Sequence, residues 1–93
     1  MLVERSELLI KEGMEEQFAA AMGERGVALL QGVPGVTSVK MGRGVENPNK
    51  FILLVQWVNM DAHKEFNRSP ACTDLRQLIG PFSKGGAMEH FEM

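Results

Sequence analysis

Two side chains able to take part in chemistry lie six positions apart in the stretch VQWVNMDAHKEF, residues 55–66. Trp57, the only tryptophan, ends an apolar segment, and its indole could line a flat cavity for an aromatic ligand. His63 falls in the first turn of a predicted helix, where the positive end of the helix dipole favours a neutral ring able to accept a proton. The spacing therefore predicts a general base beside an aromatic wall. The alternatives are that Trp57 is a large core side chain and that His63 is an exposed residue of the capping turn.

No common catalytic or cofactor motif accompanies this pair. The sequence has no GxGxxG, Walker, HExxH or CxxC pattern and no nucleophile elbow. His63, His90 and Cys72 lack the spacing of metal ligands, and a site needs three or four converging ligands. We therefore expect no metal. The glycine-rich segment at 42–44 lies where a hairpin is predicted, which favours a turn over a phosphate-binding loop.

Composition indicates one small globular domain, residues 1–93, with 44% hydrophobic and 24% charged residues and a net charge of −2. Basic residues are interspersed with acidic ones, which argues against nucleic-acid binding. The longest apolar run, FILLV at 51–55, is far shorter than the roughly 18 residues that a membrane span needs. A single cysteine, Cys72, and the absence of an apolar signal segment predict a cytoplasmic protein.

The predicted elements alternate between strand and helix patterns. Residues 2–10, 36–44 and 51–58 have strand character, and the last two, joined by the turn-rich VENPNK, should form an antiparallel hairpin. Apolar residues at three- and four-residue steps predict a helix over residues 14–31, with Gly23 and Gly26 weakening its second half. A second helix should start at about Met60, be divided or restarted at Pro70, and be followed by a loop bounded by Gly80-Pro81 and Gly85-Gly86. With AMEHFEM as the last strand, the order is β-α-β-β-α-β, the ferredoxin-like α+β arrangement with a four-stranded antiparallel sheet.

The third strand predicts a partner. Its alternate residues place apolar side chains on both faces, with Phe51, Leu53, Val55 and Trp57 on one and Ile52, Leu54, Gln56 and Val58 on the other. Two helices cover only one side of such a sheet, so another surface must cover the second side. A homodimer packed through its sheet faces is the simplest solution, and a monomer covered by loops and the C-terminal tail is the alternative.

The run from residue 32 to residue 63 resembles the signature region of the antibiotic biosynthesis monooxygenase family. The matching features are Pro34-Gly35, Arg43, Asn47-Pro48, Trp57 and the pair Ala62-His63, and the closing MEHFEM is similar to the family's last strand. The resemblance implies a dimeric α/β barrel of ferredoxin-like subunits. In enzymatic members, a cavity between sheet and helices oxidises quinols or polyketide phenols with O₂ and without metal or flavin, because an electron-rich phenolate can itself reduce oxygen.

By this resemblance, Trp57 would shape an aromatic pocket, His63 would be the base and Arg43 would stabilise an oxyanion. Ser6, Leu53 and Phe66 are the expected substrate contacts. The segment ACTDLRQLIG lacks the histidine that haem-degrading relatives use, so haem is not expected. The chain also lacks tyrosine and the second histidine that a quinol-oxidising relative carries after the corresponding proline.

Three functions are consistent with these features. The leading one is a cofactor-independent monooxygenase acting on a quinol or a phenolic, polyketide-like small molecule. The second is an isomerase or lyase of a small oxygenated metabolite, which would use proton transfer without oxygen. The third is a non-catalytic ligand-binding dimer, which is favoured by the lack of an obvious titrating partner for His63.

Overall fold

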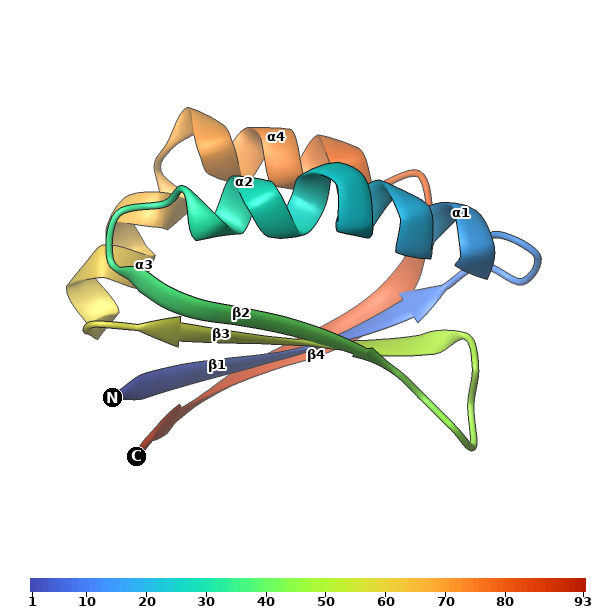
Figure 1. Cartoon of the computed structure of the whole chain (residues 1–93), viewed down its shortest axis with the longest axis horizontal. Helices are drawn as coiled ribbons and strands as arrows, with labels where there is room; N and C mark the ends of the chain where they lie inside the picture. Colours follow the sequence, from blue (N-terminus) through green and yellow to red (C-terminus); the bar gives the residue numbers. More distant parts are fainter.

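The computed structural model describes all residues from 1 to 93 and forms two layers, a sheet with helices on one side (Figure 1). The strands are β1 (Leu2–Ile10), β2 (Val36–Arg43), β3 (Lys50–Trp57) and β4 (Ser83–Glu92). The helices are α1 (Glu15–Ala21), the π-helical segment η1 (Met22–Gly26), α2 (Val27–Gln31), α3 (Met60–Asn67) and α4 (Pro70–Ile79). This order confirms the predicted ferredoxin-like arrangement.

The sheet has the strand order β2-β3-β1-β4, and every neighbouring pair is antiparallel. The two strands of the first βαβ unit, β1 and β2, are therefore not neighbours, because β3 lies between them. The predicted hairpin between β2 and β3 is confirmed. Because β1 lies between β3 and β4, residues of all three strands meet across the sheet, and Glu4 of β1 is directly opposite Val55 on one side and His90 on the other.

Alternation along β3 decides which face forms the core. Its odd-numbered residues from 51 to 57 are buried under the helices, and Trp57 and Val55 have no exposed surface. The intervening Ile52 and Leu54 point to the opposite face, where they are only partly covered. Burying an aromatic or aliphatic side chain contributes about 1.5–3 kcal/mol, so this row of side chains is a main source of stability.

The first helical region is interrupted, which the sequence pattern over residues 14–31 does not predict. A π-helical turn separates α1 from α2 at the two glycines of that region. Gly26 is buried, and a β-carbon there would meet the side chain of Met22, whose residue is fully buried. The glycine therefore allows close packing where a single regular helix was expected.

The second helical region divides at Pro70, one of the two outcomes that the sequence allows. Asn59 caps α3 by accepting a hydrogen bond from the backbone N–H of Ala62 at 2.9 Å. Ser69 caps α4 in the same way, accepting from the N–H of Cys72 at 3.3 Å, and Pro70 occupies the first turn, where no donor is needed. None of the helices is long and apolar enough to cross a membrane.

The start of the last strand corrects the prediction. Gly85 and Gly86 do not bound a loop but belong to β4, which begins at Ser83. Gly85 has a φ of +150°, close to a register shift between Leu9 and Ile10 on β1. A β-carbon at Gly86 would meet the backbone carbonyl of Glu7. The glycines therefore mark close backbone approach within a strand, the other common meaning of glycine in a strand pattern.

Candidate active site

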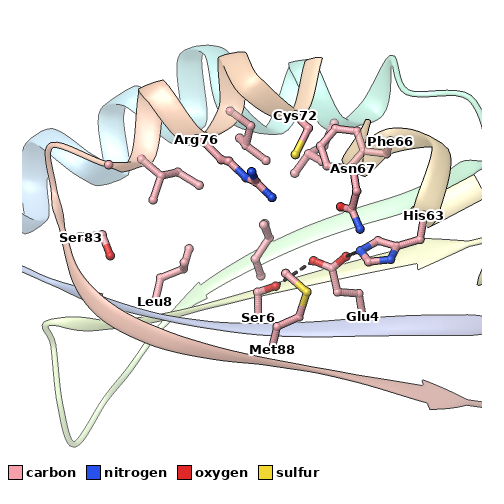
Figure 2. Close-up of a pocket in the computed structure, with 15 residues that line it drawn as sticks. Glu4, Ser6, Leu8, His63, Phe66, Asn67, Cys72, Arg76, Ser83 and Met88 are labelled. Atoms are coloured by element: carbon pink, nitrogen blue, oxygen red, sulfur yellow. Dashed lines mark hydrogen bonds and ion pairs between the residues drawn. The ribbon is translucent and has the colours of Figure 1, made fainter. Parts of the chain in front are cut away.

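A cavity of about 320 Å³ lies between the sheet and the helices (Figure 2). Its floor comes from β1 and β3, its roof from α2, α3 and α4, and one side from β4. Eight of the fifteen residues that line it are hydrophobic, namely Leu8, Leu30, Leu53, Phe66, Cys72, Leu75, Ile79 and Met88. Met88 of β4 is 56% exposed, so the helices leave the β4 side of the cavity open to a ligand.

A buried carboxylate, Glu4, lies at one end of this cavity. The residue is 5% exposed, although its position in β1 would suit an apolar side chain. Its Oε1 accepts a hydrogen bond from the indole Nε1–H of Trp57 at 3.2 Å, and its Oε2 accepts one from the hydroxyl of Ser6 at 2.8 Å. These donors offset the cost of removing a charge from water, which is several kcal/mol when a buried ion has no partner.

His63 shares this carboxylate. Its Nε2 lies 3.2 Å from Oε1 of Glu4, and its side chain is 8% exposed (Figure 2). The alternative of an exposed capping-turn residue is therefore wrong. Burial lowers the pKa of His63 below 6.5; the Glu4 carboxylate opposes this shift and the neighbouring His90 adds to it. Because burial dominates, the imidazole is neutral at pH 7 and can accept a proton.

A second imidazole, His90 of β4, completes the polar group. The ring centroids of His63 and His90 are 4.5 Å apart, with an interplanar angle of 63°. The Nε2 atom of His90 is buried and has no hydrogen-bond partner in the protein. Strand parity alone did not indicate the face of His90; its register opposite Glu4 puts it on the helix side.

The structure brings together most of the residues selected from the sequence. His63, Ser6, Leu53 and Phe66 all line the cavity. Trp57 lies behind the lining, fully buried, with its ring centroid 5.1 Å from that of His63 and 5.5 Å from that of Phe66. Trp57 is thus a core side chain and not a wall of this cavity, and it supports the polar group from behind through its hydrogen bond to Glu4.

Arg43 is the one selected residue that the structure places elsewhere. Its guanidinium donates through Nε to the carbonyl of Pro48 at 2.6 Å and through an Nη atom to Glu16 at 2.8 Å. It also lies 5.4 Å above the centre of the Phe51 ring. These contacts hold the hairpin end of the sheet against α1, and Arg43 does not line the cavity that contains His63.

The sequence reasoning missed both residues of the cavity lining that carry a full charge, Glu4 and Arg76. Glu4 shares strand parity with the buried Leu2 and with Ser6, and a charged residue in such a row is the signal that could have found it. Arg76 is four positions after the cavity residue Cys72 on α4, and therefore lies on the same helix face. Its guanidinium points toward the cavity in Figure 2 and forms no salt bridge.

This arrangement can bind a flat apolar molecule and move a proton. The apolar lining can pack against the rings of such a molecule, His63 can accept a proton from a hydroxyl or an activated C–H group, and Glu4 can stabilise the resulting imidazolium. Arg76 supplies the one positive charge of the lining, which suits an oxyanion or an acidic substituent. Glu4 and His63, together with the neighbouring His90, could also ligate a metal ion.

Comparisons with known proteins place the chain in a family. The family model for antibiotic biosynthesis monooxygenases matches residues 1–78. The uncharacterised protein YczJ of Bacillus subtilis (strain 168) is 29% identical, over 99% of this chain and 98% of its own length. A Bordetella bronchiseptica protein whose name assigns it to these monooxygenases is 26% identical, with a TM-score of 0.88 over 99% of this chain and 95% of the other. A variant of SnoaB, a cofactor-independent oxygenase from Streptomyces nogalater, shares the fold with a TM-score of 0.85 at 15% identity, over 99% of this chain and 91% of the other. The chain belongs to the antibiotic biosynthesis monooxygenase family.

Proposed function

We propose that the protein is a cofactor-independent monooxygenase that oxidises a quinol or a phenolic, polyketide-like small molecule with O₂. The observation that carries the proposal is a buried imidazole in the wall of an apolar cavity, held beside a carboxylate. His63 has lost most of its contact with water yet still lines the cavity, and Glu4 is 3.2 Å from its Nε2. A base in such a place can generate a phenolate where water does not compete for it.

The reaction that fits this site needs only the substrate as reductant. His63 takes a proton from the phenol or from a methylene group that the phenol activates. The resulting anion transfers electrons to O₂, a carbon–oxygen bond forms, and the proton returns to give a hydroperoxide. The carbon that carries the hydroperoxide then loses its remaining hydrogen as a proton and the O–O bond breaks, so that one oxygen stays in a new carbonyl group and the other departs as water. Glu4 stabilises the imidazolium that exists between the two proton transfers.

Arg76 supports a substrate with an acidic or strongly polarised oxygen at the end remote from the base. Its guanidinium has no carboxylate partner in the protein and points toward the cavity (Figure 2). An arginine binds an oxyanion through charge-assisted hydrogen bonds, each contributing about 1.5–3 kcal/mol. We therefore expect an aromatic compound with a phenol near His63 and an ionised or carbonyl oxygen near Arg76.

We also propose that the protein is a cytoplasmic homodimer joined through its sheet faces. Ile52 and Leu54 support this, because they lie on the sheet face opposite the helices and remain partly exposed in one chain. Cys72 is buried and unpaired, which is compatible with a reducing compartment.

The test is oxygen uptake by the metal-stripped protein with a panel of hydroquinones and polycyclic phenols. Uptake should depend on substrate and fall at least about 100-fold in His63→Ala, since general-base catalysis is typically worth 10²–10⁴. Lys64→Ala is the matched control, because Lys64 is the next residue of α3 and is exposed. Equal uptake by His63→Ala and Lys64→Ala would refute the role of His63.

An isomerase or lyase is the second candidate, favoured by the same Glu4–His63 pair, which can transfer a proton without any oxidant. The two candidates differ in whether substrate conversion requires O₂. Substrate conversion that continues unchanged under argon would replace the monooxygenase with this candidate. The non-catalytic alternative has lost its main support, because His63 has two titratable neighbours, Glu4 and His90.

A further inference from the structure

Three side chains of types that can ligate metals converge at one end of the cavity, although they come from three different elements. Glu4 belongs to β1, His63 to α3 and His90 to β4, and one ligand atom of each lies within 4.8 Å of the others. We propose that Glu4, His63 and His90 form a binding site for one divalent transition-metal ion of the zinc type. The proposal does not rest on the oxidation chemistry above. It goes beyond that chemistry, because a metal bound here would coordinate His63, the proposed base.

The donor set suits such an ion. Two imidazole nitrogens and one carboxylate oxygen are a common set of three protein ligands for zinc, with a fourth position left to water or substrate. With bonds of about 2.1 Å, two ligand atoms on a tetrahedral ion are roughly 3.4 Å apart. His63 and Glu4 already have nearly this separation, 3.2 Å. The longest separation is at most 4.8 Å, so metal binding would require one side chain to move inward by up to about 1.4 Å.

His90 is the ligand best able to make that movement. It lies on the edge strand β4 and is only partly buried. Its Nε2 atom is nevertheless buried and lacks a partner in the protein. An unpaired buried nitrogen is costly, and a metal ion would satisfy it. Two imidazoles and a carboxylate this close together could therefore bind a metal ion, which neither histidine could do alone.

The surroundings of Glu4 are those of a metal-ligating carboxylate. Trp57 donates to one of its oxygens at 3.2 Å and Ser6 to the other at 2.8 Å. Each carboxylate oxygen has two lone-pair directions, so these bonds leave room for a metal. Outer hydrogen bonds of this kind orient ligands, and their loss typically weakens metal binding 10- to 100-fold. Glu4 and His63 also line the cavity, so the open coordination position would face it.

The metal-bound and base-competent forms of the site exclude each other. An imidazole nitrogen that holds a metal cannot accept a proton, and a metal-bound His63 is fixed at the cavity wall. Zinc would therefore act as an inhibitor of the proposed oxidation, and its removal would restore the base. The cluster would give the same cavity a metal-sensitive off state.

Cobalt(II) provides the direct test, using the full-length chain without a histidine tag. Low-coordinate cobalt(II) absorbs visible light strongly, and a nearby cobalt ion quenches tryptophan fluorescence. Trp57 is the only tryptophan and donates to Glu4, so a cobalt ion at this site would lie next to the only indole of the chain. We expect one equivalent of cobalt to give a visible band and to quench Trp57, and Zn²⁺ to displace it.

Variants separate this site from others. His90→Gln should weaken cobalt binding at least tenfold while circular dichroism shows an unchanged fold. Glu4→Gln, which removes the carboxylate ligand, should also weaken cobalt binding. Its matched control is Glu7→Gln, because Glu7 is also on β1 but pairs with Arg5 and Lys50 on the opposite face of the sheet. Cys72→Ser controls for thiolate binding within the same cavity.

The outcomes are distinct from those of the oxygen-uptake assay. Absence of the band in folded wild-type protein, an equal band in His90→Gln, or a band lost in Cys72→Ser would each overturn the metal site. Where oxygen uptake is measurable, Zn²⁺ should abolish it in the wild type. A protein that takes up no oxygen but binds cobalt through His90 would refute the proposed function and leave the metal site intact.

Discussion

At the scale of single residues, Glu4 organises the site. One carboxylate holds the indole of Trp57, the hydroxyl of Ser6 and the imidazole of His63, and so joins β1, β3 and α3. A buried network of this type is stable only when every member is satisfied, because the interior strengthens hydrogen bonds and also raises the cost of losing one. Its members should therefore act together and not independently.

A double-mutant cycle on Glu4 and Trp57 tests this coupling. Trp57→Phe keeps an aromatic ring but removes the donor, and Glu4→Gln keeps the shape but removes the charge. Each should reduce the free energy of unfolding by about 1–3 kcal/mol, since each leaves a buried polar group without its partner. Urea denaturation followed by circular dichroism should show the double variant less destabilised than the sum, by about 0.5–3 kcal/mol. Strictly additive losses would mean that the 3.2 Å contact contributes nothing.

Arg76 gives a prediction about substrate selection. If its free guanidinium binds an oxyanion, Arg76→Ala should raise KM about tenfold or more for an acidic phenol, while changing kcat little, because it removes binding common to ground and transition states. A neutral phenol of similar size should be unaffected. Arg68→Ala is the control, since Arg68 is exposed like Arg76 but pairs with Glu65 and does not line the cavity. Equal effects on acidic and neutral phenols would show that Arg76 acts through packing alone.

At the scale of elements, the glycines of the strands differ in how much the free energy of unfolding should fall when each is replaced by alanine. A β-carbon at Gly86 would meet the backbone carbonyl of Glu7, which cannot move without disturbing β1. We expect Gly86→Ala to lower the free energy of unfolding by about 1–3 kcal/mol, the usual cost of forced backbone shifts. Gly42→Ala on β2 is the matched comparison, because its β-carbon meets only Ile52 Cγ2 at 3.4 Å. It should be neutral or slightly stabilising. Thermal or urea unfolding distinguishes them, and equal stability would contradict the close approach.

The observed elements also show which parts of the fold and of the site can be predicted from the sequence. Periodicity and turn residues predict the strand and helix order, because β3 alternates plainly and Asn59 and Pro70 mark helix starts. The place of His63 in a first helical turn, and the resemblance to the family for Ser6, Leu53 and Phe66, select four residues that do line one cavity. They miss Glu4 and the pairing of His63 with His90, because those contacts join three elements through strand register. The π-helical turn and the strand role of Gly86 were missed because a glycine signals a break and close packing alike.

At the scale of the whole molecule, the uncovered face of the sheet is the main unsatisfied feature. The helices all lie on one side in Figure 1. On the other side, Leu54 and Ile52 of β3 are partly exposed, flanked by the charged Arg5 and Lys40. A stable interface buries about 1,200–2,000 Å² in total. Sheet-to-sheet packing of two copies would remove these aliphatic side chains from water without disturbing the cavity.

Leu54→Glu tests this packing while preserving the single chain. Arg5 and Lys40 are the register partners of Leu54, so a carboxylate there can pair with them in the monomer but would be buried against its own copy in a dimer. Sedimentation should therefore show the wild type as a dimer and Leu54→Glu as a monomer at the same concentration. Lys64→Glu, an exposed charge reversal on α3 over the opposite face of the sheet, should leave the dimer intact. If Leu54→Glu remained a dimer, the two copies would have to meet through another surface, and the exposed edge at β4 would be the next to examine.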